Sequence, residues 1–163
     1  MKLFKKYAPV IAAALGVIAI IMIFLPAIVA GENNYSGLKI VFGYKETVKS
    51  LIGESKVELL KFSFMNLLPY LLVLAGAALC VLSFLGKGNK YFVYAAIACF
   101  ALAAIFFFCA IPFTLLADYL QDAADKLGVN AKEEWKLGAG SVIAAICSIF
   151  SAACTAAPIF LKD

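Results

Sequence analysis

The chain has 163 residues, of which 65% are hydrophobic and 15% are charged, with a mean hydropathy of +1.00. A soluble globular domain has about 45–50% apolar residues, so this composition points to the membrane. The formal charge of +4 comes from 14 lysines and 10 acids, and we interpret it as a topology signal and not as a nucleic-acid-binding surface.

Four stretches without a charged residue predict four transmembrane helices. A helix needs about 20 apolar residues to cross a hydrocarbon core of about 30 Å, and each stretch is longer than that. The stretches cover residues 7–31, 62–86, 91–117 and 137–161, which leaves outer loops at 32–61 and 118–136. We therefore expect a single domain over residues 1–163, an all-α membrane protein. It would be a four-transmembrane-helix bundle with a small extracellular β-hairpin cap and a short extracellular helix.

The first stretch follows a basic tail, MKLFKK, and has two possible interpretations. A secretory signal peptide also begins with basic residues and ends with small ones, such as those after Pro26. However, the apolar run from Val10 to Ala30 is longer than the usual signal-peptide run of about 7–15 residues. We interpret it as an uncleaved first transmembrane helix.

The segment YSGLKIVFGYK in the first outer loop alternates apolar with polar or small residues, which is typical of a β-strand. One side of such a strand would face the bundle, and the other side would face water or a partner. The bundle-facing residues would be Leu38, Ile40 and Phe42, and the others Lys39, Val41 and Lys45. Gly43 would mark a bulge or a close approach of two backbones.

The same loop predicts a partner for this strand. A turn at Gly53–Glu54 is followed by KVELLKFSF, which begins with alternation, so we expect a hairpin. A lone hairpin is marginal in water, and its apolar face must therefore rest on the outer ends of the helices and on the second loop. The candidate residues of this outer cap are Tyr35, Leu38, Lys39, Ile40, Phe42, Tyr44 and Trp135.

The second outer loop predicts a short helix. Apolar residues recur at helical spacing from Leu120 to Leu127, and Gly128 follows as a stop signal. Trp135, the only tryptophan, comes just before the fourth stretch, where an interfacial aromatic side chain is typical.

The fourth stretch carries a row of small residues spaced by four. Such rows let two helix backbones approach closely in lipid. The predicted packing stripe consists of Gly140, Ala144, Ser148, Ala152 and Ala156.

Asn66 and Thr114 are the candidate polar side chains within the predicted spans. Asn66 could line a cavity or form a hydrogen bond to another helix, and we favour the hydrogen bond. The four stretches contain neither lysines nor acids. Ion- and proton-coupled transport uses ionisable residues within the membrane, so we do not expect it here.

The lysines predict the orientation of the helices. If the helices alternate, the N-terminal tail, the link GKGNK and the C-terminus share one side. That side has six lysines and one acid, and the opposite side has eight lysines and nine acids. Short lysine-rich segments stay in the cytoplasm. We expect a multi-pass protein of the plasma (cell) membrane with both termini in the cytoplasm.

The chain has no histidine, and none of its acids lies within a predicted span. Ser-His triads, His-ligated metals and intramembrane carboxylate catalysis are therefore excluded, and we expect no enzyme, no cofactor and no metal site. The five cysteines all lie in the apolar stretches, where we interpret them as packing residues and not as a disulfide framework of the outer loops.

Three segments, YSGLKIVFGY, KFSFMNLLPYLL and WKLGAG, resemble small, functionally uncharacterised four-helix membrane proteins of Gram-positive bacteria. The layout, with a β-rich first outer loop and a shorter second one, is similar to that of claudin-like tetraspan proteins. Claudins carry a W-GLW-C-C pattern in the first loop, and this chain has neither a tryptophan nor a cysteine there. The resemblance therefore implies a comparable arrangement of elements and not claudin function.

These features favour a small integral membrane scaffold or interaction protein that presents an ordered outer cap to a protein or peptide partner. Two alternatives are an accessory subunit of a transporter or channel and an immunity-type membrane protein that shields a membrane target. The expected partners are the lipid bilayer and a membrane or extracellular protein. A homo-oligomer is a further possibility, and nucleic acid is not expected.

Overall fold

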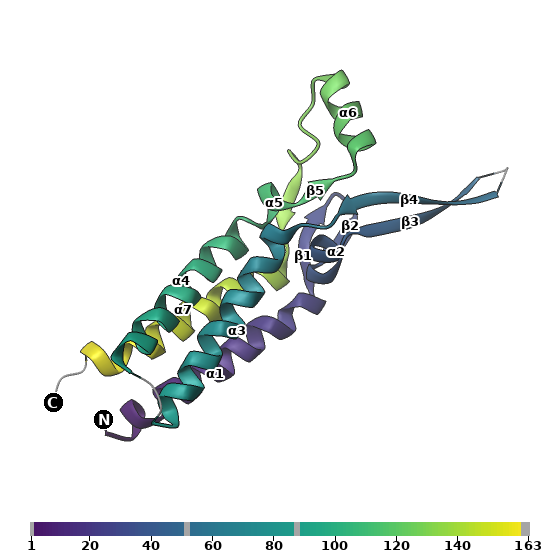
Figure 1. Cartoon of the computed structure of the whole chain (residues 1–163). Coiled ribbons are helices and arrows are strands. Elements are labelled where there is room, and N and C mark those ends of the chain that lie inside the picture. The colour runs from purple at the N-terminus through teal and green to yellow at the C-terminus, as the bar shows by residue number, and fades with distance from the viewer. Residues whose placement is uncertain (1, 51–52, 87–88, 161–163) are drawn as a thin grey trace.

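Four long helices form an elongated bundle, and two small sheets cover one of its ends (Figure 1). The computed structural model describes residues 2–50, 53–86 and 89–160. The bundle helices are α1 (Lys2–Ile21), α3 (Phe64–Phe84), α4 (Lys90–Phe108) and α7 (Ala139–Phe160). Each is long and apolar enough to cross a membrane, which confirms the prediction of four candidate membrane-spanning helices within the described residues.

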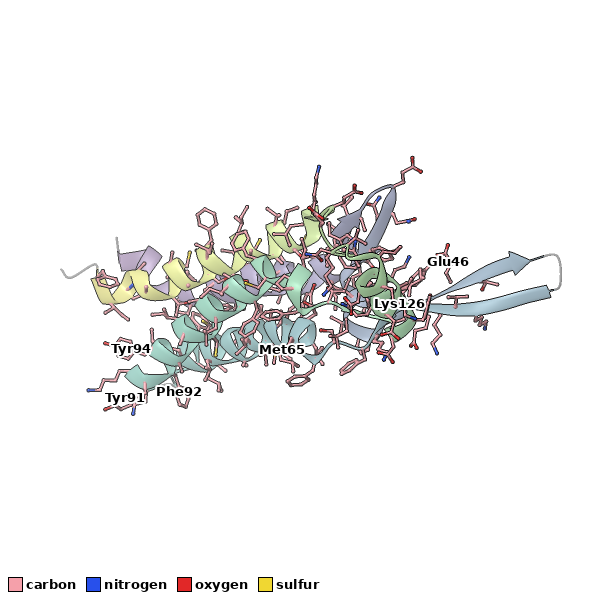
Figure 2. All side chains as sticks on the ribbon, turned by 90° about the horizontal axis from the view of Figure 1, so that it is seen from above. Glu46, Met65, Tyr91, Phe92, Tyr94 and Lys126 are labelled. Atoms are coloured by element: carbon pink, nitrogen blue, oxygen red, sulfur yellow. The ribbon has the colours of Figure 1, made fainter. Side chains whose placement is uncertain are left out.

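The two ends of the bundle differ in what they carry. The N- and C-terminal ends of the chain lie together at one end, which we call the terminal end, and the sheets lie at the other, the cap end (Figure 1). Figure 2 shows Tyr91 and Tyr94 near the terminal end, and Glu46 and Lys126 at the cap end. Both of these tyrosines are more than half exposed, which suits the boundary between lipid and water.

A large aromatic side chain from α4, Phe100, lies in the core of the bundle. The helices pack in the order α1, α3, α4 and α7, and α7 returns against α1. Phe100 is fully buried. A Cβ atom added at Gly16 of α1 or Gly76 of α3 would meet its ring at 3.3 or 3.1 Å. The small residues of two helices thus make room for the ring, and the close fit gains dispersion energy.

The first predicted span, residues 7–31, is too long as a helix. The helix α1 ends at Ile21, a 3₁₀ turn covers Met22–Phe24, and the strand β1 runs from Pro26 to Ala30. Proline lacks a backbone N–H and disfavours a helical conformation in the residue before it, so the chain leaves the helix before Pro26. The apolar residues from Pro26 onward form a β-strand instead of continuing the helix.

The third predicted span, residues 91–117, is also shorter than expected. The helix α4 ends at Phe108, and a separate turn, α5 (Ala110–Phe113), follows it. Pro112 explains the break, because in a continuous helix its ring would clash with the carbonyl of Phe108 four residues earlier. Thr114 therefore lies after α5 and not inside a spanning helix.

Short strands from distant parts of the chain pair at the cap end. In the first sheet, β1 lies between β2 (Asn33–Ser36) and β6 (Trp135–Leu137), and both pairings are antiparallel. In the second sheet, β4 (Gly53–Lys61) lies between β3 (Tyr44–Ser50) and β5 (Leu115–Leu116), again antiparallel. Each sheet therefore joins the segment after α1 to a segment after α4. The expected hairpin is present as β3 and β4, with its first strand further along the chain than predicted, and it is part of one of two three-stranded sheets.

The predicted short helix of the second loop is present as α6 (Asp118–Leu127). It ends at Gly128, as expected, with a φ of 66° that glycine adopts without a steric penalty. On its apolar side Ala124 is buried, whereas Leu127 is 76% exposed. Only part of that side is therefore covered by the rest of the cap.

The single strand predicted over residues 35–45 is wrong, because Gly37–Phe42 in its middle form a short helix, α2. The helix buries Ile40 and Val41 and leaves Phe42 61% exposed. Val41 and Phe42 thus point opposite to the expected directions. The reason is that consecutive helical residues turn by about 100°, whereas strand residues alternate sides.

Two glycines explain where α2 begins and ends. A Cβ atom at Gly37 would lie 2.8 Å from the carbonyl oxygen of Ile23, and one at Gly43 would lie 2.8 Å from that of Leu60. Gly43 also has a φ of 87°. The close backbone approach predicted at Gly43 is therefore confirmed. The predicted turn at Gly53–Glu54 is wrong because both residues belong to β4, and the link at 51–52 lies outside the described residues.

Candidate interaction site

The cap, which we define as residues 26–50, 53–61 and 110–138, has an apolar core of its own. Its buried members come from β1, α2, β4 and α5. They are Ala27, Ile28, Ile40, Leu60 and Ala110. Because these side chains lie on four different elements of the cap, the core fixes how the two sheets and α2 sit relative to one another.

An aromatic row crosses the cap. The ring centroids of Trp135 and Tyr35 are 6.2 Å apart, and those of Tyr35 and Tyr44 are 6.0 Å apart. The Lys39 ammonium lies 4.0 Å from the centroid of the Tyr44 ring, within the range of a cation–π contact. Four of the predicted cap residues therefore meet in one row.

The other predicted cap residues lie around this row. Ile40 is in the apolar core and Leu38 is half-buried. Phe42 points away, and its ring lies 6.4 Å from that of Phe62. The pKa of Tyr35 is raised above its ordinary value, first by burial and then by the nearby carboxylate of Glu46.

A polar joint, formed by Ser63, Asn66 and Thr114, ties the start of α3 to the segment after α4. Ser63 caps α3, since its Oγ accepts from the Asn66 N–H at 3.3 Å, and it donates to the Phe113 carbonyl at 2.6 Å. The Asn66 amide lies 2.9 Å from Thr114 Oγ1. The surroundings favour the amide orientation in which its nitrogen donates to the Ala110 carbonyl at 3.3 Å.

All three residues of the polar joint are buried, at 3% exposure or less. Asn66 therefore forms the hydrogen bond between segments that its sequence position favoured. Buried polar groups cost free energy when left unpaired, so the joint fixes one relative position of α3 and α5.

Lys132, which the sequence did not single out, closes the joint from the side of the second loop. Its ammonium donates to the Thr114 carbonyl at 2.5 Å and to the Pro112 carbonyl at 3.5 Å. Burial lowers the pKa of this lysine. A cation at the end of α5 satisfies carbonyls that have no partner within the helix.

The start of α7 packs directly on the backbone of β1. A Cβ atom at Gly138 would lie 2.3 Å from the Pro26 carbonyl oxygen, and one at Gly140 would lie 2.9 Å from it. The Gly138 N–H donates to the Ala27 carbonyl at 2.8 Å. The segment WKLGAG thus combines a strand residue, Trp135, with the glycines that let a helix begin against a sheet.

The buried face of α7 differs in part from the predicted stripe. Gly140, Ala144 and Ser148 are buried, whereas Ala152 and Ala156 are half-buried. A row spaced by four drifts around a helix by about 40° at each step, so its last members turn away from the neighbouring helices.

Four buried hydroxyl residues also lie on α7. Ser141, Ser148 and Thr155 are spaced by seven, and Ser151 lies three residues after Ser148. Ser151 donates to the Ala12 carbonyl of α1 at 3.0 Å.

A groove lies between the two sheets. It measures about 250 Å³, and its walls come from β1, β2, β4, β5, β6, α6 and the segment before β6. Its lining includes two aromatic side chains, Tyr35 and Trp135, and the leucines Leu59, Leu116 and Leu120. The ion pair between Lys61 and Asp118, at 2.6 Å, joins β4 to α6 beside it. The groove has room for an apolar side chain of a bound segment.

The hairpin of β3 and β4 projects beyond the rest of the cap (Figure 1). Within the described residues, β4 pairs with a third strand only at Leu60 and Lys61. Beyond these two residues the ribbon has exposed side chains, among them Lys45, Glu46 and Lys56. Lys45 and Glu58 face each other across the strands with a distance of 3.8 Å. Along much of the ribbon, the outward-facing backbone donors and acceptors of the described residues therefore have no partner strand.

No family model, curated protein or solved structure matches this chain. The site is therefore assigned from its geometry alone.

Proposed function

We propose that this protein is a multi-pass membrane protein whose cap binds a protein or peptide segment. The projecting β3–β4 hairpin is the observation that carries the proposal. A two-stranded ribbon without an apolar face against the protein is marginal in water, because it fixes many backbone dihedrals and buries little surface. A partner that pairs with its edge would supply the missing contacts.

The binding mode that these edges support is strand addition, in which an extended segment forms main-chain hydrogen bonds with an open sheet edge. Main-chain pairing gives affinity, and a pocket for a side chain gives specificity. The groove beside Tyr35 and Trp135 is such a pocket, and aromatic residues are enriched among the strongest contacts of interfaces. The function does not need a catalytic group.

The orientation that fits this function places both termini in the cytoplasm and the cap outside. It rests on the excess of lysines at the terminal end, six against one acid in the sequence. In a cysteine-free background, a cysteine at Asn130 should react with an impermeant maleimide in intact cells, and one at Asn89 should not. Reaction at Asn89 with protection at Asn130 would reverse the orientation.

The binding function is tested by photo-crosslinking in native membranes. A benzophenone amino acid at Thr47 or Lys56, both exposed on the hairpin, should give a discrete protein adduct. The same residue at Ile149, which is exposed on α7, should not. The adduct should form again when the two purified proteins are mixed. Adducts at Ile149 alone would move the interaction to the bundle.

A charge change supplies a matched pair of variants. Glu46→Lys on the hairpin should reduce recovery of the partner several-fold, whereas Asp122→Lys on α6 should leave it unchanged. Both side chains are exposed, so neither change should affect folding. Equal recovery with the two variants would contradict a binding role for the hairpin.

A further inference from the structure

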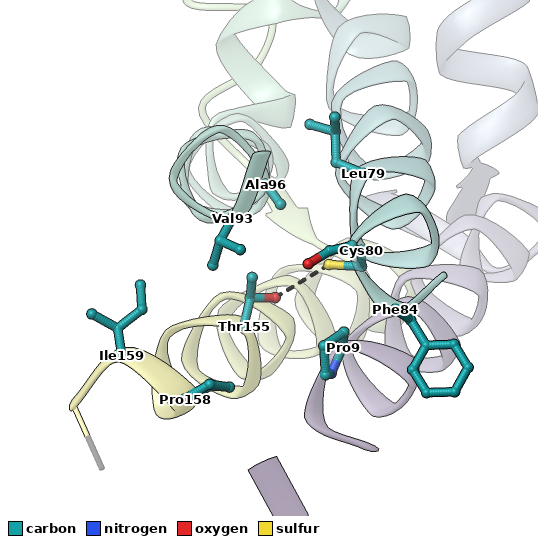
Figure 3. A pocket seen from close by; sticks show the side chains of 10 residues that line it. Pro9, Leu79, Cys80, Phe84, Val93, Ala96, Thr155, Pro158 and Ile159 are labelled. Carbon is teal, nitrogen blue, oxygen red and sulfur yellow. Dashed lines mark hydrogen bonds between the residues drawn. The ribbon is translucent and has the colours of Figure 1, made fainter. Parts of the chain in front are cut away.

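A second pocket opens at the terminal end of the bundle, far from the cap (Figure 3). It measures about 390 Å³, and all four bundle helices contribute to its walls. Figure 3 shows Val93 and Ala96 of α4 across from Cys80 of α3 and Thr155 of α7. The size falls within the range of about 300–1,000 Å³ that is usual for small-molecule sites.

The pocket is lined mainly by apolar side chains, and two of its polar side chains, Cys80 and Thr155, are paired with each other. Cys80 Sγ lies 3.4 Å from Thr155 Oγ1, and that hydroxyl donates to the Ser151 carbonyl at 2.7 Å. None of the residues that line the pocket is charged. A ligand group that enters it must therefore be apolar, since an ion or a strongly polar group would lose its hydration without gaining a partner.

A void of this size between helices lowers the stability of the bundle. The side chains around it lose dispersion contacts, because they have no atoms to touch on one side. A flexible hydrocarbon chain restores these contacts. However, lipid tails are as apolar as leucine, so an apolar wall alone gives no preference for one lipid over another.

The preference comes from charge at the same end of the bundle. Lys90 is the first residue of α4, about one turn before Val93, and it is exposed. The sequence of α1 begins KLFKK, with Pro9, another pocket residue, shortly after it. Basic pockets between membrane helices are known to bind the headgroups of anionic lipids.

We infer that this pocket binds one acyl chain of an anionic phospholipid, whose headgroup is held at the lysine-rich terminal end. The bound lipid would fill the gap between α3, α4 and α7 and hold the helix ends together. This role is independent of the cap and of any partner bound there.

Native mass spectrometry of the purified full chain tests the inference. The protein is incubated in detergent with phosphatidylglycerol or with phosphatidylcholine that has the same acyl chains. Wild type should retain one phosphatidylglycerol molecule and several-fold less phosphatidylcholine. Ala96→Leu, which fills the pocket, should reduce phosphatidylglycerol retention several-fold, and Ala95→Leu should not, because Ala95 is exposed on the same helix.

Ser83→Leu is a second pocket-filling variant at a half-buried position, and it tests the inference if Ala96→Leu fails to fold. Wild-type retention of phosphatidylglycerol in both pocket-filling variants, or in whichever of them folds, would show that the lipid binds elsewhere. Equal retention of the two lipids by wild type would overturn the assignment to an anionic lipid.

Discussion

In the bundle, small residues on neighbouring helices surround one large ring, whereas in the cap each strand depends on a partner from a distant segment. Phe100 sits against Gly16 and Gly76, and a long helix forms most of its backbone hydrogen bonds within itself. In the cap, β1 needs β6 and β4 needs β5. The bundle should therefore tolerate changes on its exposed outer side, whereas the cap depends on a few contacts between segments.

The largest expected effect lies at the centre of the bundle. Phe100→Ala should lower the free energy of unfolding by about 3–5 kcal/mol, because it leaves a cavity between three helices. Thermal unfolding in detergent, followed by circular dichroism, measures the loss. Phe108→Ala is the control, since Phe108 is on the same helix and 46% exposed. Similar losses for both variants would show that the centre is not closed around Phe100.

The next effect separates the cap from the bundle. Ile40→Ala should destabilise the cap by about 2–5 kcal/mol and speed proteolysis within residues 26–61, while the helical unfolding transition moves much less. Phe42→Ala should resemble wild type, because Phe42 is 61% exposed. If Phe42→Ala is cleaved faster than Ile40→Ala, the strand predicted from the sequence describes this segment better than α2 does.

A smaller effect is expected where the two regions meet. Asn66→Ala removes only the hydrogen bonds of the Asn66 side chain within the polar joint and leaves Thr114 with fewer partners, at a cost of about 1–3 kcal/mol. Unlike Ile40→Ala, it should shift both the proteolysis of the cap and the thermal transition of the bundle. A shift in only one of them would mean that the joint does not couple the two regions.

The smallest expected effect concerns the aromatic row. The folded pKa of Tyr35 is raised, so the protonated phenol contributes to stability below the ordinary tyrosine pKa of about 10. That contribution is lost as the pH rises through the folded value. The absorbance difference between wild type and Tyr35→Phe should show a titration above that of ordinary tyrosine. Glu46→Gln should move it to lower pH, and an unchanged midpoint would place Glu46 away from the ring.

Much of the fold could be predicted because membrane helices leave a strong local signal. The apolar stretches identified four helices, Gly128 was recognised as a helix stop, and Gly43 as a bulge or a close approach of two backbones. The stretch after Pro26 was misread because an apolar run does not say whether it will be a helix or a central strand. Pairing with β2 and β6 decided that question, and both partners lie outside the run.

The candidate site was predicted less well, for a related reason. Tyr35, Tyr44 and Trp135 were expected in the cap, and they meet in one row. Lys132 was missed because the carbonyls that it caps become available only after Pro112 ends the helix before it.

By itself the sequence determined the features that depend on composition and on neighbouring residues: four apolar helices, a lysine-rich terminal end and the helix of the second loop. Only the tertiary structure decided that residues 37–42 coil into α2 and that both sheets join the two loops. The alternation of six residues favours a strand by a small margin. Burial of Ile40 in the cap core and of Val41 against the bundle outweighs that margin, because the free energy of packing depends on contacts that no local pattern contains.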